Sequence, residues 1–152
     1  MNDDSLRLLE RQFYSKRDKQ YWLIDVFLEI TIKTLIAEEL IYALDDYSLV
    51  REWSKPGDLI CFVLVSKGVV AHAEVESGPT YRLHYKVEDP VYYPWVITLK
   101  NVHLYLDDPV IINFALLMKL DFRPKPVRCI YRFPNEYMLK ENDFYLLTRN
   151  ST

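Results

Sequence analysis

The clearest pattern along the chain is an apolar run from Leu59 to Val65, a short Ser66-Lys67-Gly68 turn, and then a segment in which polar residues alternate. This pattern predicts a β-hairpin, because alternate side chains of a strand point to opposite faces. The segment 91–106 predicts a further long strand. Aromatic and β-branched residues favour a first strand over 21–30, and 126–133 favours a closing strand.

Helical spacing alternates with these strands. Apolar residues recur at helical intervals in 5–20, and in 34–46, where Thr34 is a candidate cap and Ile36, Leu40 and Leu44 form the stripe. Asp108 and Pro109 favour the start of a helix that continues over 110–120. A short helix is also expected over 139–147. The order indicates an α+β protein with a mixed, curled sheet or small barrel of about five strands and flanking helices, rather than a doubly wound parallel sheet.

Composition narrows the class of protein. A chain of 152 residues that is 50% hydrophobic suits one domain with a proper core. The first ten residues lack the apolar core of a signal peptide, and Cys61 and Cys129 lack metal spacing, so we expect buried thiols and a cytoplasmic protein. The apolar region 22–44 carries charged residues that argue against a membrane span.

Charge is unevenly distributed along the chain. The net charge of −3 argues against a protein that coats nucleic acid by bulk electrostatics. Acidic residues gather in 25–46, whereas 119–132 contains five bases, which could contact a nucleic-acid backbone: Lys119, Arg123, Lys125, Arg128 and Arg132. A solvated basic surface is the alternative reading.

Motifs for catalysis are weak. No glycine-rich phosphate loop or nucleophile elbow occurs, and we expect neither cofactor nor metal. His72, Glu74 and Glu76 share one strand face, which could be an acid–base site but reads more simply as a solvated face. Helix capping explains Asp107 and Asp108, Cys61 reads as a core residue, and Cys129 lies near arginines that would lower its pKa if it is exposed.

Aromatic residues are more informative. Tryptophan and tyrosine gather at the ends of the predicted strands, where they could stack on a planar ligand, although each could equally be a core residue. The candidate ligand-binding residues are Trp22, Trp53, Tyr81, Tyr93 and Trp95.

Five ordered segments then resemble a known family: "YWLI", "SKPGDLICFVL", "GVVAHAEVESGPTY", "YYPWVITLKNV" and "LKENDFYLL". They are similar to the blocks of an EVE-type domain of the PUA-like superfamily, over 21–152, with 1–20 outside as a helical appendage. The resemblance implies a pseudo-barrel of five or six strands, related to YTH domains, that holds a modified or extruded base in an aromatic pocket. The GxKxxExR signature of the related ASCH domains is absent.

Three hypotheses follow. The first is a domain that binds RNA or DNA, with a modified or extruded base in its pocket. The second is an accessory protein that binds a partner, or forms a homodimer, through the helix at 5–20. The third, which we favour least, is an enzyme acting on RNA or a nucleotide through His72 and Glu74.

Overall fold

The computed structural model describes residues 19–65, 67–121 and 135–148. Their elements follow in the order β1 (Tyr21–Val26), α2 (Glu29–Thr31), the π-helical turn η1 (Ile32–Ile36), β2 (Ile41–Leu44), α3 (Leu49–Trp53), β3 (Leu59–Leu64), β4 (Gly68–Tyr81), β5 (Trp95–Leu104), α4 (Phe114–Lys119), β6 (Glu136–Leu139) and α5 (Glu141–Thr148).

The six strands form one mixed sheet in the order β2-β5-β4-β3-β1-β6. β1 and β3 pair in parallel in the middle of the sheet, and the other neighbours are antiparallel. Nearly every residue of β1 and β3 is buried, since both of their faces are covered. The chain is therefore an α+β protein, and the predicted pseudo-barrel with flanking helices is confirmed.

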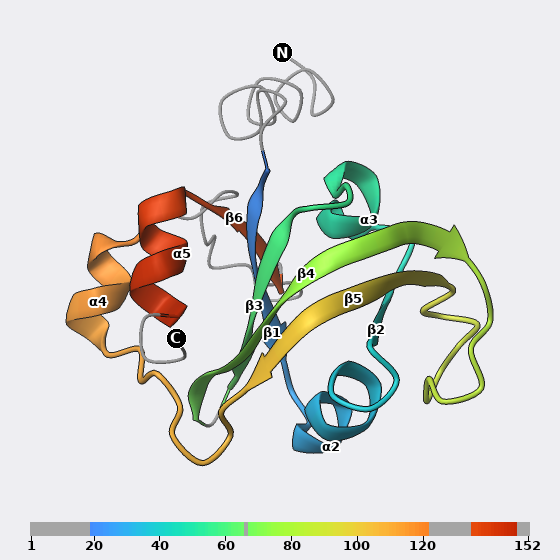
Figure 1. The fold of residues 1–152 in the computed structure, drawn as a ribbon, viewed down its shortest axis with the longest axis horizontal. Helices are drawn as coiled ribbons and strands as arrows, with labels where there is room; N and C mark the ends of the chain where they lie inside the picture. Colours follow the sequence, from blue (N-terminus) through green and yellow to red (C-terminus); the bar gives the residue numbers. More distant parts are fainter. Residues whose placement is uncertain (1–18, 66, 122–134, 149–152) are drawn as a thin grey trace.

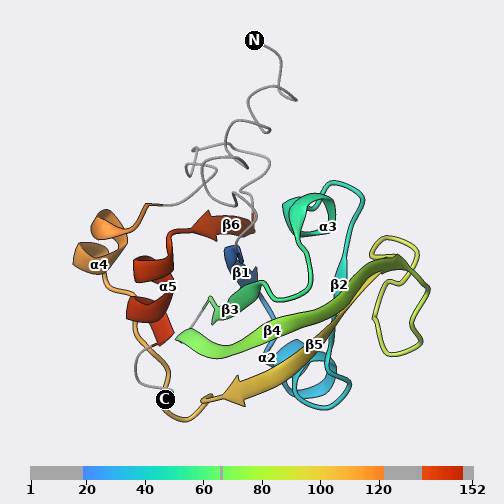
Figure 2. The same cartoon turned by 45° about the horizontal axis from the view of Figure 1, so that its top comes forward.

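The sheet curls into a half-barrel with a separate core on each face. The long strands β4 and β5 sweep around β1 and β3, with α4 and α5 on one side (Figure 1), and the turned view shows the same curl from above (Figure 2). The inner core contains Trp22, Ile24 and Phe62, whereas Tyr21, Leu23 and Phe144 pack in the outer core under α5. Alternate residues of β1 thus serve opposite cores.

The Pro-Gly-Asp turn before β3 is held by hydrogen bonds to distant strands. Gly57 has a φ of +95°, a conformation that costs glycine little, and its N–H donates to the Val75 carbonyl at 2.9 Å. Asp58 is fully buried and accepts hydrogen bonds from Gln20, Lys55 and the Trp22 indole. The turn therefore ties β1, β3 and β4 together.

The helix predicted over 34–46 is wrong in its second half. The helical segment begins earlier, at Glu29, and Leu40 adopts a φ of 57°, which ends any helix. Beyond it, Ile41–Leu44 pairs with β5, and the Thr34 hydroxyl bonds back to the Ile30 carbonyl instead of capping a helix start.

The helix predicted from Asp108 begins later than expected. Val110 forms a β-bridge with Val69, so this segment extends along the sheet before turning. α4 starts only at Phe114, where the Asn113 side chain accepts from the Leu116 N–H at 2.8 Å. The hairpin, the strand within 91–106 and the C-terminal helix are confirmed.

Two predicted elements lie outside the described residues. They are the strand over 126–133 and the greater part of the helix over 5–20, and the division of the chain into 1–20 and 21–152 stays a prediction. The last described strand is instead β6, just after this range.

Candidate functional site

A cavity of about 410 Å³ opens at the seam of the half-barrel, where its sheet does not close. Its walls come from the end of β1, the α2–η1 helical segment, β2, the connection between β4 and β5, and Asn135 just before β6. β2 and β6 are the two unpaired edges of the sheet. The cavity therefore lies where segments far apart in sequence meet.

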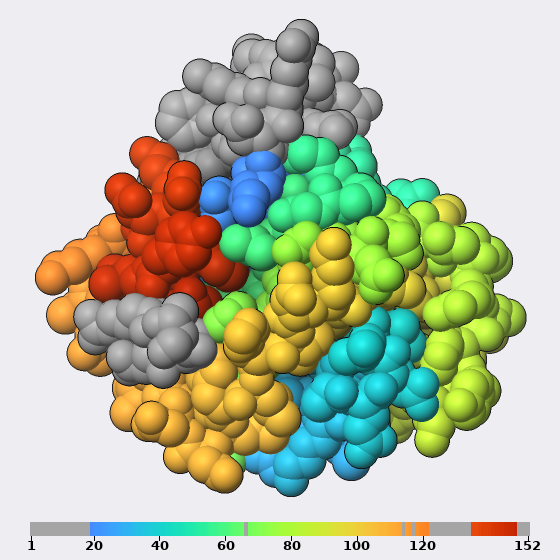
Figure 3. All heavy atoms as spheres, viewed as in Figure 1, coloured from blue at the N-terminus to red at the C-terminus, as the bar shows by residue number. Residues whose placement is uncertain are grey.

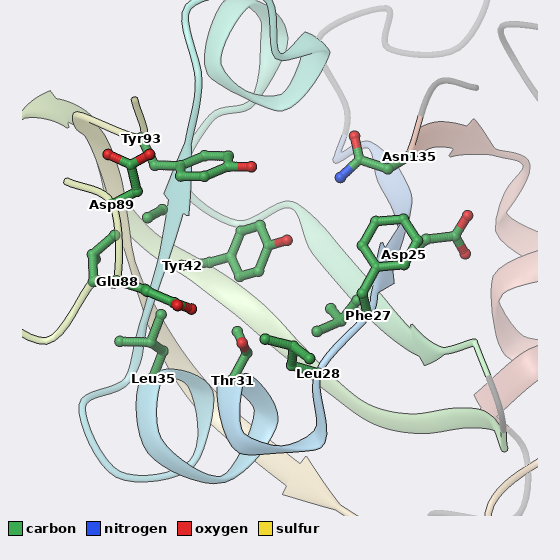
Figure 4. Close-up of a pocket in the computed structure, with 13 residues that line it drawn as sticks. Asp25, Phe27, Leu28, Thr31, Leu35, Tyr42, Glu88, Asp89, Tyr93 and Asn135 are labelled. Carbon is green, nitrogen blue, oxygen red and sulfur yellow. The ribbon is translucent and has the colours of Figure 1, made fainter. Parts of the chain in front are cut away.

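Aromatic rings line this cavity. Figure 4 shows the rings of Tyr42 and Tyr93 side by side with both hydroxyls directed across the cavity, and Phe27 facing them from the end of β1. Tyr42 is 9% exposed, and among the described residues its hydroxyl has no hydrogen-bond partner. Burial raises the pKa of both tyrosines, so their hydroxyls stay neutral and can donate or accept a hydrogen bond.

The polar groups around the rings are mainly carboxylates. Asp25, Glu88 and Asp89 line the cavity, and no lysine or arginine is among its described lining residues. Burial raises the pKa of Asp25 to about 6, although its carboxyl points away from the two tyrosines (Figure 4). The Asn135 side-chain amide adds a donor and an acceptor on the opposite wall.

A second group of aromatic residues, which we call the β4–β5 platform, comprises Tyr81, Tyr85, Tyr92 and Trp95. Tyr81 meets Trp95 edge to face at 5.2 Å between ring centroids, and the Arg51 guanidinium lies 4.4 Å from the Trp95 ring centroid. The segment that joins these strands forms the right-hand edge of the molecule in Figure 3. The three tyrosines are exposed, so their rings are accessible to a ligand.

Cationic side chains accompany the platform. The Lys86 ammonium lies 5.6 Å from the Tyr85 ring centroid, and Arg82 is exposed next to Tyr81. The Arg82 side chain has no partner among the described residues. The Trp95 indole also donates to Asp46 at 2.7 Å, so the platform combines accessible rings with three bases and one acid, whereas the charged groups that line the cavity are all acidic.

The predicted ligand-binding residues fall into three places. Tyr93 lines the cavity, and Tyr81 and Trp95 meet on the platform. Trp22 and Trp53 belong to the inner core, with no more than 5% of either exposed, and the Trp22 indole donates to Asp58 at 3.1 Å.

The predicted backbone-binding residues are not brought together in the described part of the chain. Lys119 is exposed at the end of α4, whose neighbouring residues pack on the outer core. The other four, Arg123, Lys125, Arg128 and Arg132, lie outside the described residues, as does Cys129.

The strand face with His72, Glu74 and Glu76 does not form a single site. The His72 ring stacks on His103 at 4.6 Å and bonds the Tyr105 hydroxyl at 3.0 Å, and burial lowers its pKa to about 4. Glu74 instead pairs with Lys100 across an irregularity in the strand register.

Three further findings concern the Cys61 thiol, metal ligands and membrane-spanning helices. Cys61 is fully buried in the outer core, and burial raises the pKa of its thiol. No group of three or more potential metal ligands occurs among the described side chains. In the parts of the chain that are described, no helix combines the length and apolar character needed to cross a membrane.

Comparison with known proteins leaves the family open. No protein-family model matches the chain, and no curated protein matches it. Among solved structures, the chain is similar to the Mmi1 YTH domain, with a TM-score of 0.42 and 15% identity over 54% of this chain and 58% of that chain. The chain thus spans little more than half of that domain's length. Membership of the EVE-type family stays a prediction.

Sequence reasoning missed most of the cavity. The sequence pattern places Tyr42 in a predicted helix and Phe27 inside a predicted strand, and Asn135 lies outside every predicted element. These residues become neighbours only because the sheet curls and leaves its β2 edge near the end of β1. Tyr93 is the one lining residue among the predicted ligand-binding residues, and the local signal for it is the Tyr92-Tyr93 pair shortly before β5.

Proposed function

We propose that this protein binds single-stranded nucleic acid, RNA or DNA, and that one unpaired base, extruded or modified, enters the cavity at the seam of the half-barrel. The observation that carries the proposal is the pairing of Tyr42 and Tyr93 along a cavity of about 410 Å³. This volume falls within the range of about 300 to 1,000 Å³ that small-molecule sites occupy.

The chemistry of the cavity suits a nucleobase. A base is flat, so it stacks on an aromatic ring, and its edge carries donors and acceptors that identify it. The Tyr42 hydroxyl, which lacks a partner among the described residues, and the Asn135 amide would bond that edge. The resemblance of the sequence to EVE-type domains implies the same use.

The platform would hold the strand on either side of the base. Tyr81 and Tyr85 offer exposed rings for neighbouring bases, while Arg82 and Lys86 offer positive charge to phosphates. Two phosphate contacts on a single strand give a slope of about −1.4 in log K against log salt, or roughly 7-fold weaker binding between 50 and 200 mM salt.

Fluorescence anisotropy with labelled oligonucleotides tests the proposal. We expect single strands to bind more tightly than duplexes of the same sequence, because extruding a base from a duplex costs a few kcal/mol. Tyr93→Leu should weaken binding about tenfold or more, given that stacking contributes about 1 to 3 kcal/mol per base.

Tyr145→Leu is the matched control. Tyr145 is 46% exposed against 39% for Tyr93, but it lies on α5, which covers the opposite face of β1. Equal effects of the two substitutions, or the absence of salt-sensitive binding at micromolar protein, would rule the proposal out.

A further inference from the structure

The cavity is more acidic than the platform. Three of its lining side chains are carboxylic acids, and no described lining residue is basic. Figure 4 shows the Glu88 carboxylate directed toward Thr31 and Leu35, and that of Asp89 beside Tyr93. A phosphate or a carboxylate ligand would therefore be repelled from this cavity.

The field of the carboxylates reaches the aromatic rings. Burial is the main reason that the pKa of Tyr93 is raised, and Tyr92, Asp45 behind the cavity wall and the lining residue Asp89 raise it further. The same negative potential that disfavours a tyrosinate stabilises a positive charge at that place. The faces of Tyr42, Tyr93 and Phe27 add to it, since an aromatic face attracts a cation.

The Tyr42 hydroxyl is an independent sign that the cavity receives a polar ligand. It is attached to a side chain that is nine-tenths buried, it points into the cavity, and it has no partner among the described residues. A ligand that fills the cavity would exclude water from this hydroxyl, so only a ligand that bonds it would avoid the cost of an unpaired buried group.

We infer that the base taken by this cavity is positively charged, as are purines and pyrimidines alkylated on a ring nitrogen. This inference rests on the proposed function and sharpens it. A cationic base would stack on the tyrosines like any other base and would gain the attraction of the rings and of Glu88 and Asp89 as well. An alkylated ammonium group on a basic peptide suits the platform less, because Arg82 and Lys86 would repel such a peptide.

A comparison of two isomeric methylated adenines tests the effect of the charge of the base apart from the effect of its size. N1-methyladenine carries a positive charge at neutral pH, whereas N6-methyladenine has the same atoms apart from the extra proton and is neutral. We would measure binding of three single-stranded RNAs that differ only at one central base: adenine, N1-methyladenine and N6-methyladenine. We expect the N1-methyl strand to bind about tenfold more tightly than the N6-methyl strand, with cation–π attraction providing much of the difference.

A double variant, Glu88→Gln with Asp89→Asn, tests whether the carboxylates cause this preference. Both residues are exposed, and asparagine keeps the oxygen that accepts from the Tyr92 N–H. The variant should bind the N1-methyl strand more weakly and the unmodified strand more tightly, because neutralisation removes both the attraction for the cation and the repulsion of phosphate. Asp107→Asn, an exposed acid that does not line the cavity, should leave the preference intact.

The possible results test the preference for a cationic base separately from the proposed binding of nucleic acid. Equal binding of the two isomers, with tight binding of single strands overall, would overturn the inference and leave the proposed function standing. Failure of every single strand to bind would overturn both. Tighter binding of a trimethyl-lysine peptide than of the N1-methyl strand would also overturn the inference.

Discussion

The carboxylate of Asp58 should be the most sensitive point of the fold. It is fully buried and accepts hydrogen bonds from the Gln20 N–H at 2.9 Å, the Gln20 side-chain amide at 2.9 Å, the Trp22 indole at 3.1 Å and the Lys55 N–H at 3.1 Å. The Lys55 ammonium lies 3.3 Å from the same carboxylate. One side chain thereby joins the start of β1 to the turn before β3.

The expected loss of stability follows from the number of buried hydrogen-bond donors that a substitution would leave without an acceptor. In Asp58→Ala, the Gln20 N–H and the Trp22 indole N–H would be left buried without this acceptor. Each unpaired buried donor costs about 1 to 3 kcal/mol, so we expect a loss of about 2 to 6 kcal/mol in the free energy of unfolding. Domains of this kind have only about 5 to 15 kcal/mol in total.

Urea unfolding, followed by tryptophan fluorescence and far-ultraviolet circular dichroism, measures this loss. Asp58→Asn should lose less than Asp58→Ala, because it keeps one acceptor oxygen, and exposed Asp107→Asn should change stability by less than about 0.5 kcal/mol. A loss below about 1 kcal/mol for Asp58→Ala would refute the reasoning, since it would mean that the buried donors find other partners.

Three further predictions concern the strand ends around the site. Burial raises the pKa of Asp25 from 3.8 to about 6, so the unfolded chain loses this proton at a lower pH than the folded protein, and stability falls as pH rises from 3.8 to about 6 and is level above that. After allowance for partial exposure, Asp25→Asn should gain about 1 to 2 kcal/mol relative to wild type between pH 4 and pH 7.5, and parallel pH–stability curves would contradict this. Gly78→Ala should lose about 1 to 3 kcal/mol in thermal unfolding, because Gly78 has a φ of +98° and a Cβ there would lie 2.7 Å from the Val96 carbonyl oxygen; an unchanged melting temperature would count against it. Replacing Arg82 and Lys86 together by glutamine should flatten the salt dependence of oligonucleotide binding by about 1.4 in slope, and an unaltered slope would place the phosphate contacts elsewhere.

The architecture could be anticipated where alternation in the sequence was unambiguous. β3 is apolar throughout, β4 and β5 have one clear apolar face, and α5 has a compact helical pattern, so the local pattern agrees with the final packing. The prediction for the segment 34–46 is wrong in part because its apolar residues, spaced by four, fit a helix and also fit a strand that begins at Ile41. The positive φ of Leu40 ends the helix and allows the strand to begin. The Leu40 carbonyl accepts from the Leu99 N–H at 2.7 Å, a tertiary contact that cannot be predicted from the local sequence.

The site was harder to anticipate because aromatic residues serve several purposes. Trp22 and Trp53 carry the same side chain as Trp95, yet the first two fill the inner core, whereas Trp95 is only partly buried at the margin of that core, beside Arg51 on the platform. Nothing in their local sequence separates these roles, since burial depends on how far the sheet curls. The acid content of the cavity follows from the same curl, which brings Asp25 from β1 and Glu88 from a connection 63 residues later to one opening.

The most direct test of the central claim is an NMR titration of the nitrogen-15-labelled protein with a short single-stranded RNA. If a base enters the cavity, amide shift changes should concentrate at Phe27, Leu28, Ala43 and Val87, which line it, and extend to Tyr81 on the platform. Changes centred on α5 and the outer face of the sheet, or no changes at saturating RNA, would contradict the account.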